Sequence, residues 1–165
     1  EREMTSINPK TDLVLERVVD VSPELVWKAW TEPKHLMPWF CPKPWQVVEC
    51  EIDLVPGGKF YTVMQGPDGT RMPPGNGCYL EVVPNRRLVW TSALEPGWRP
   101  QTSPDAPFLF TCILTFEPDG KGGCKYRAVA MHKDEKSAEM HSQMGFHQGW
   151  GAALDQLVAY MKQVG

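Results

Sequence analysis

The hydrophobic pattern of the chain changes its period near residue 134, and this change limits the folds open to it. Before this point, short apolar runs rich in β-branched residues are separated by glycine and proline, which is typical of strands. After it, apolar residues recur at steps of three and four: Phe146, Trp150, Leu154, Leu157 and Met161. We expect one helix of about 28 residues, roughly 40 Å long. Because a helix with a single apolar face must bury that face, the pattern predicts a two-layer α+β fold.

The strands are expected to form one curved antiparallel sheet of six to seven strands. The strand-like runs are 13–21, 46–54, 58–65, 77–83, 87–94, 108–117 and 124–132. Turn signals such as Pro56-Gly57-Gly58 and Asp119-Gly120 separate them without intervening helices, so an antiparallel meander follows. After the first strand, Ser22-Pro23-Glu24 and Thr31-Glu32-Pro33 have the residues that open helices, which predicts two short helices there.

Two segments are too rich in proline to be regular structure. Residues 38–46 combine proline with Trp39, Phe40 and Trp45, and residues 95–107 form the one long loop between strands. A loop of that length is often a cover over a site. The length of 165 residues suits one domain, which we place at 13–165 after an N-terminal extension, 1–12.

Charge and cysteine usage exclude several classes of protein. The 17 basic and 20 acidic residues give a net charge of −3, whereas a nucleic-acid-binding domain is expected to be basic. No apolar run is long enough to predict membrane insertion, and Glu1-Arg2-Glu3-Met4-Thr5 lacks the apolar region of a signal peptide. The five cysteines include no C-x-x-C pair, so reduced thiols and a cytoplasmic location are expected.

Strand alternation predicts which side chains face the helix. In 124–132, Tyr126 and His132 are expected to point inward with the alanines between them. Tyr79 and Glu81 are expected to share a face, more naturally the outer one. Large rings mixed with small residues predict an apolar cavity beside the helix, and its candidate ligand-binding residues are Trp39, Phe40, Trp45, Phe60, Met64, Trp90, Phe110, Cys112, His132, Phe146, His147 and Trp150.

His132 and His147 are the polar candidates in this set. If both face the cavity, they can hold a polar group of a ligand or act as acid and base near neutral pH. The alternative is that each is a structural histidine bonded to a backbone carbonyl. His35 and His141 are expected to face solvent. No metal site is predicted, because His141 and His147 are six residues apart, a poor spacing for one helical face, and no cofactor is expected.

Several motifs together resemble a known superfamily. They are Leu25-Val26-Trp27-Lys28-Ala29-Trp30-Thr31-Glu32-Pro33 with Trp39, Pro56-Gly57-Gly58-Lys59-Phe60, Gly66-Pro67-Asp68-Gly69, Gly77 to Val89, and Gly145-Phe146-His147-Gln148-Gly149-Trp150 with Leu154, Asp155 and Leu157. In this order they resemble the SRPBCC (START-like) superfamily, in the branch named for homology to the activator of the heat-shock-protein-90 ATPase. The resemblance implies the helix-grip fold and a hydrophobic small molecule held between helix and sheet.

Three functions are therefore compatible with the sequence. The first is binding of an aromatic or lipid-like small molecule in a cavity between the C-terminal helix and the sheet, without nucleic acid or membrane as a partner. The second is a cyclase, dehydratase or hydrolase that uses His132 and His147. The third is the interaction with a chaperone ATPase that the branch name suggests. A homodimer is also open, because strand edges and the aromatic residues of 39–45 can pair.

Overall fold

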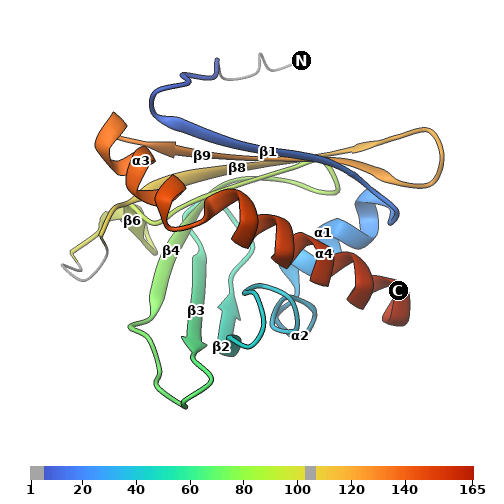
Figure 1. Cartoon of the computed structure of the whole chain (residues 1–165), viewed down its shortest axis with the longest axis horizontal. Helices are drawn as coiled ribbons and strands as arrows, with labels where there is room; N and C mark the ends of the chain where they lie inside the picture. Colours follow the sequence, from blue (N-terminus) through green and yellow to red (C-terminus); the bar gives the residue numbers. More distant parts are fainter. Residues whose placement is uncertain (1–5, 103–106) are drawn as a thin grey trace.

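The computed structural model describes residues 6–102 and 107–165, and its main feature is a curved sheet crossed by a long helix (Figure 1). The sheet has seven strands in the spatial order β1-β9-β8-β5-β4-β3-β2, and every neighbouring pair is antiparallel. Its strands are β1 (Asp12–Val19), β2 (Gln46–Ile52), β3 (Lys59–Gln65), β4 (Gly75–Val83), β5 (Arg87–Thr91), β8 (Phe110–Pro118) and β9 (Cys124–His132). The predicted helix-grip architecture is confirmed.

The remaining elements cover or extend this sheet. The helices are α1 (Pro23–Thr31), α2 (Pro33–Leu36), α3 (Glu135–Gln143) and α4 (Phe146–Val164). A small separate hairpin, β6 (Leu94–Glu95) and β7 (Arg99–Pro100), begins at the last residue of the predicted strand 87–94 and continues into 95–107, which was expected to be a loop. Residues 103–106 of that loop, and 1–5 of the predicted extension 1–12, lie outside the described residues.

The two short helices begin where the sequence indicates. The Oγ of Ser22 accepts a hydrogen bond from the backbone N–H of Leu25 at 3.3 Å, and Pro23 occupies the first turn of α1, where its missing N–H costs nothing. Val26, Ala29 and Trp30 are buried on one face of this helix. The cap therefore sets the start of α1, and its apolar face sets how it packs.

The C-terminal helix differs from the prediction because it is two helices rather than one. Gly145 has a φ of 93°, a left-handed conformation that glycine adopts without a steric penalty. The N–H of Gly145 bonds to the carbonyl of Ser142 at 3.0 Å, which closes the end of α3. The heptad-like apolar pattern continues across this break, so periodicity alone did not reveal it.

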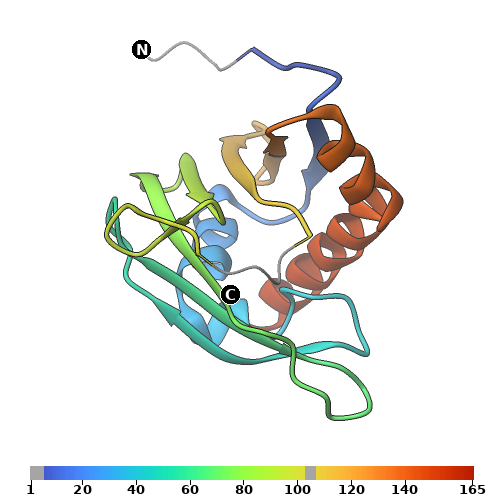
Figure 2. The same ribbon diagram turned by 90° about the vertical axis from the view of Figure 1, so that its left-hand side faces the viewer.

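The side of the sheet that each strand turns inward is mostly as predicted. Phe60, Trp90, Leu114 and Tyr126 belong to one hydrophobic core with Leu154, beneath α4. Figure 2 shows the sheet bent around this interior, with α4 along its open side. Val89, Ile113 and Val129 form a smaller cluster from the alternate positions of their strands, on the opposite face.

Tyr79 is the exception, and the expectation that it shares the outer face with Glu81 is wrong. The register between β4 and β5 shifts between Tyr79 and Glu81, which is the effect of a β-bulge. Tyr79 is fully buried and stacks on Phe60 at 5.4 Å between ring centroids. Glu81 instead pairs with Arg87.

No helix among the described residues is long and apolar enough to cross a membrane.

Candidate functional site: an aromatic cavity beneath the C-terminal helix

A cavity of about 380 Å³ lies between α4 and the concave face of the sheet. The sheet contributes residues from β3, β5, β8 and β9, and the start of β4 contributes Gly75, Asn76 and Gly77. The other walls come from α1, the segment 39–42 and α4. The lining residues are Trp30, Trp39, Phe40, Cys41, Pro42, Phe60, Thr62, Met64, Gly75, Asn76, Gly77, Trp90, Ser92, Phe110, Tyr126, Gly149, Trp150 and Ala153.

Aromatic rings form a continuous wall around this cavity. Phe60 is in contact with Phe40 at 5.7 Å and with Trp90 at 5.0 Å between ring centroids. The wall extends through Trp30, whose ring lies 5.0 Å from that of Trp39. Most of these pairs meet edge to face, an arrangement that aromatic quadrupoles favour. Each ring is thus packed against others, so the wall is formed without a ligand.

The segment 39–43 is fastened over the cavity by one side chain of α4. The amide Nε2 of Gln156 donates to the carbonyls of Trp39 at 3.1 Å and Cys41 at 2.9 Å. Its Oε1 accepts from the backbone N–H of Lys43 at 2.9 Å. Because this proline-rich segment cannot satisfy these groups by regular structure, Gln156 supplies the partners. It thereby holds Phe40 and Cys41 as part of the wall.

Gly149 leaves part of the cavity open. It lies inside α4 and lines the cavity, and a Cβ built on it would meet no atom within 4 Å. Glycine inside a helix costs about 0.5–1 kcal/mol relative to alanine. A side chain at this position would project into free space, so the glycine preserves cavity volume at the expense of helix stability.

Among the described residues, the lining carries no ionisable acid or base other than the thiol of Cys41 and the phenol of Tyr126. Burial raises the pKa of the Cys41 thiol to about 11, and burial, with a smaller effect of Cys112, raises the pKa of Tyr126 further above its usual range. Both are neutral at physiological pH. Ser92 is already engaged, because its Oγ accepts from the N–H of Phe110 at 3.0 Å. The cavity is therefore uncharged and largely apolar.

The structure brings together part of the predicted ligand-binding set. The residues of that set that line the cavity are Trp39, Phe40, Phe60, Met64, Trp90, Phe110 and Trp150. Cys112 and Phe146 are buried in the core instead, and Trp45 is 39% exposed with its ring beside Gly66. Sequence reasoning missed Trp30, although its place on the apolar face of α1 was visible, and missed Gly149, although a glycine inside a helix pattern is itself a signal.

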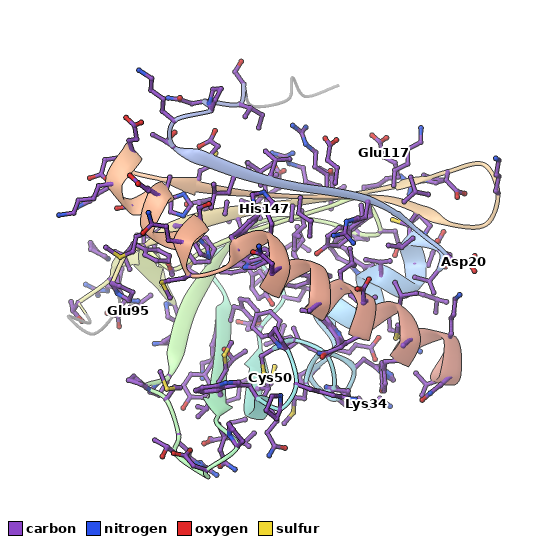
Figure 3. The ribbon with its side chains drawn as sticks, viewed as in Figure 1. Asp20, Lys34, Cys50, Glu95, Glu117 and His147 are labelled. Atoms are coloured by element: carbon purple, nitrogen blue, oxygen red, sulfur yellow. The ribbon has the colours of Figure 1, made fainter. Side chains whose placement is uncertain are left out.

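His132 and His147 do not meet in the cavity, so the predicted acid–base pair is not assembled. The Nδ1 of His132 donates to the carbonyl of Thr11 at 2.8 Å. The Nε2 of His147 donates to the carbonyl of Val14 at 3.1 Å, and Figure 3 shows His147 on the side of α4 near β1. Neither side chain lines the cavity. Both have the backbone partner that the structural alternative requires.

His132 forms a hydrogen-bonded pair with His141. The prediction that His141 faces solvent is wrong. His141 is 8% exposed, and its Nδ1 lies 2.9 Å from Nε2 of His132. In the neutral form of His132, Nδ1 carries the proton donated to Thr11, so Nε2 accepts and Nδ1 of His141 donates. Burial, with a smaller contribution from His132, lowers the pKa of His141 from 6.5 to about 4.

His35 is the second histidine whose predicted exposure is wrong. It is buried between α2 and α4, and its Nδ1 lies 2.8 Å from the hydroxyl of Tyr160. The hydroxyl of a residue distant in the chain satisfies the ring, a pairing that local sequence does not indicate. Among the described residues, no group of three or more histidine, cysteine or acidic side chains could hold a metal ion.

Comparison with known proteins adds a family and a set of similar structures. Residues 20–162 match the family model described as Activator of Hsp90 ATPase homolog 1-like protein. No curated protein matches the chain. A crystal structure of a protein from Nitrosomonas europaea is 44% identical, with a TM-score of 0.89, over 95% of this chain and 97% of that one.

More distant solved structures share the fold. A solution structure from Arthrobacter aurescens is 20% identical with a TM-score of 0.79, over 93% of this chain and 87% of that one. A protein of Aeromonas hydrophila described as AHSA1-like is 20% identical with a TM-score of 0.69, over 93% of this chain and 94% of that one. At this identity the likeness concerns the fold alone.

Proposed function

The chain belongs to the family of Activator of Hsp90 ATPase homolog 1-like proteins, and on this premise we propose that it binds a compact, uncharged aromatic molecule beneath α4. The observation that carries the proposal is the continuous aromatic wall around an open space of about 380 Å³. Binding of hydrophobic ligands, which is general in this family, supports it.

Cavity size and charge narrow the class of ligand. Ligand cavities commonly span about 300–1,000 Å³, and this one lies near the lower end. A ligand of one or a few fused rings suits that space better than a long lipid chain. No described side chain of the lining carries a charge at neutral pH, and burying an unpaired ion in an apolar site is costly. A neutral ligand is therefore favoured over a carboxylate.

An enzymatic role through His132 and His147 receives no support from this geometry. A general acid or base must reach the reacting atom directly or through one water. Both rings lie outside the cavity lining, and each is bonded to a backbone carbonyl. Binding explains the same cavity without requiring either histidine to move.

Binding is tested with ethylnaphthalene as an uncharged probe and naphthoate as its charged counterpart. Several tryptophans line the cavity, so quenching of intrinsic fluorescence and the thermal midpoint of unfolding both report occupancy. The uncharged probe should quench and stabilise, by about 2.7 kcal/mol at a hundredfold its dissociation constant. Naphthoate should bind at least tenfold more weakly. Absence of quenching and of stabilisation by the uncharged probe would overturn the proposal.

A pair of substitutions in α4 locates the site. Gly149→Leu places a side chain in the free space and should abolish binding, while circular dichroism confirms that the helix is retained. Ala159→Leu adds similar bulk at an exposed position of the same helix and should leave the affinity unchanged. Equal affinity in both variants would show that the probe binds somewhere other than this cavity.

A further inference from the structure

Tyr126 contributes a polar hydroxyl group to the lining of the cavity. Its ring lies on the inward face of β9, is only 4% exposed, and lines the cavity where α1 packs. Trp30 is close enough to lower the pKa of the phenol, although its indole N–H makes no complete hydrogen bond. Since an indole can only donate, Trp30 cannot accept the O–H proton of Tyr126, which can be donated to a ligand.

The hydroxyl stays a donor across the physiological range. Burial is the largest influence on Tyr126, and it raises the pKa of the phenol, so the O–H proton is retained. The aromatic residues around it offer no acceptor of their own. Phe116 lies 5.9 Å away between ring centroids and presents only a ring.

Two neighbouring indole N–H groups also need a hydrogen-bond acceptor. The Nε1 atoms of Trp30 and Trp90 are buried and have no hydrogen-bond partner in the part of the chain that the structure describes. Both side chains line the cavity, with their ring centroids 6.4 Å apart. Unpaired buried donors are uncommon in folded proteins and call for an explanation. The described residues of this wall therefore offer donors in excess and no cation that would pair with an anionic ligand.

Resting on the proposed function, we propose that the ligand is a neutral aromatic ketone, quinone or lactone whose carbonyl oxygen accepts a hydrogen bond from the hydroxyl of Tyr126. A carbonyl is an acceptor without a proton and without charge, so it matches both the donor excess and the uncharged lining. The ring body of the same ligand occupies the space beneath Gly149, against Trp150 and Phe60.

The test compares two probes of nearly equal shape, acetylnaphthalene and ethylnaphthalene, which differ by the carbonyl oxygen. The wild-type protein should bind acetylnaphthalene about three- to tenfold more tightly, as one net hydrogen bond implies. In Tyr126→Phe the preference should fall to about parity, while the affinity for ethylnaphthalene is retained. Tyr79→Phe removes a nearby buried hydroxyl that does not line the cavity, and it should keep the wild-type preference.

A second readout is independent of any variant. The infrared stretch of the bound acetylnaphthalene carbonyl should lie at lower wavenumber than in an apolar solvent, because a hydrogen bond weakens the C=O bond. Equal binding of the two probes, a preference that survives Tyr126→Phe, or an unshifted carbonyl band would overturn this inference and leave the proposed binding intact. Failure of both probes to bind would overturn the two together.

Discussion

Acidification should destabilise this protein through His141, and the effect can be calculated. In the unfolded chain a histidine has a pKa near 6.5, whereas in the folded protein the pKa of His141 is lowered to about 4. Between these values the unfolded state binds a proton that the folded state does not, so stability falls as pH falls. The stability that His141 contributes is fully present above about pH 6.5, and its loss is complete below about pH 4.

The size of the effect follows from the linkage relation. Moving from about pH 7.5 to about pH 5 should lower the free energy of unfolding by about 2 kcal/mol through this one group. That is a large share of the roughly 5–15 kcal/mol of a typical domain. The physical cause is the surroundings of His141: the rings of Phe108 at 4.6 Å and Phe110 at 4.9 Å, with His132 as its hydrogen-bond partner.

Urea unfolding at both pH values measures the change in the free energy of unfolding, with His141→Asn as the comparison. The amide of asparagine can still donate to Nε2 of His132, but it does not titrate. The variant should lose about 2 kcal/mol less than the wild type over this pH range. His147→Asn, which removes an exposed ring of the neighbouring helix and leaves His141 in place, should show the same pH dependence as the wild type.

Two results would refute the reasoning. Equal pH dependence of wild type and His141→Asn would show that His141 is not the group responsible. A wild type that gains stability on acidification relative to the variant would show that the surrounding rings stabilise the imidazolium by cation–π contact more than burial destabilises it.

Four further substitutions have definite expected outcomes. Gly149→Ala should raise the free energy of unfolding by about 0.5–1 kcal/mol. Gly77→Ala should lower it, because the new Cβ would meet the backbone oxygen of Thr91 at 2.8 Å. If chemical denaturation gave the opposite order of stability, the packing described would be contradicted. Tyr79→Phe should leave stability unchanged or raise it by up to about 1 kcal/mol, because the hydroxyl that it removes is buried without a partner; a clear loss in a thermal melt would reveal a partner. Gln156→Ala should lower the free energy of unfolding by about 2 kcal/mol, since it removes the hydrogen bonds that fasten segment 39–43. It should also speed dissociation of the probe in stopped-flow fluorescence. Unchanged dissociation would show that this segment does not cover the site.

The sequence by itself determined the layers of the fold, because periodicity is a local property of the chain. Alternation in the last two strands correctly turned Phe110 and Tyr126 toward the helix, and the three- and four-residue steps placed Leu154 and Leu157 against the sheet. The cap at Ser22 gave the start of α1. These signals act over a few residues and need no knowledge of what lies opposite.

Tertiary structure alone decided the details that make the site. The bulge that turns Tyr79 inward depends on how β4 and β5 register. The pairing of His132 with His141 and the fastening of Trp39 by Gln156, 117 residues away along the chain, depend on which surfaces meet. Cavity volume is decided in the same way, because it is the small difference between the space enclosed by sheet and helix and the volume of the side chains that enter it. Short-range patterns report the character of each wall, but not the distance between the walls.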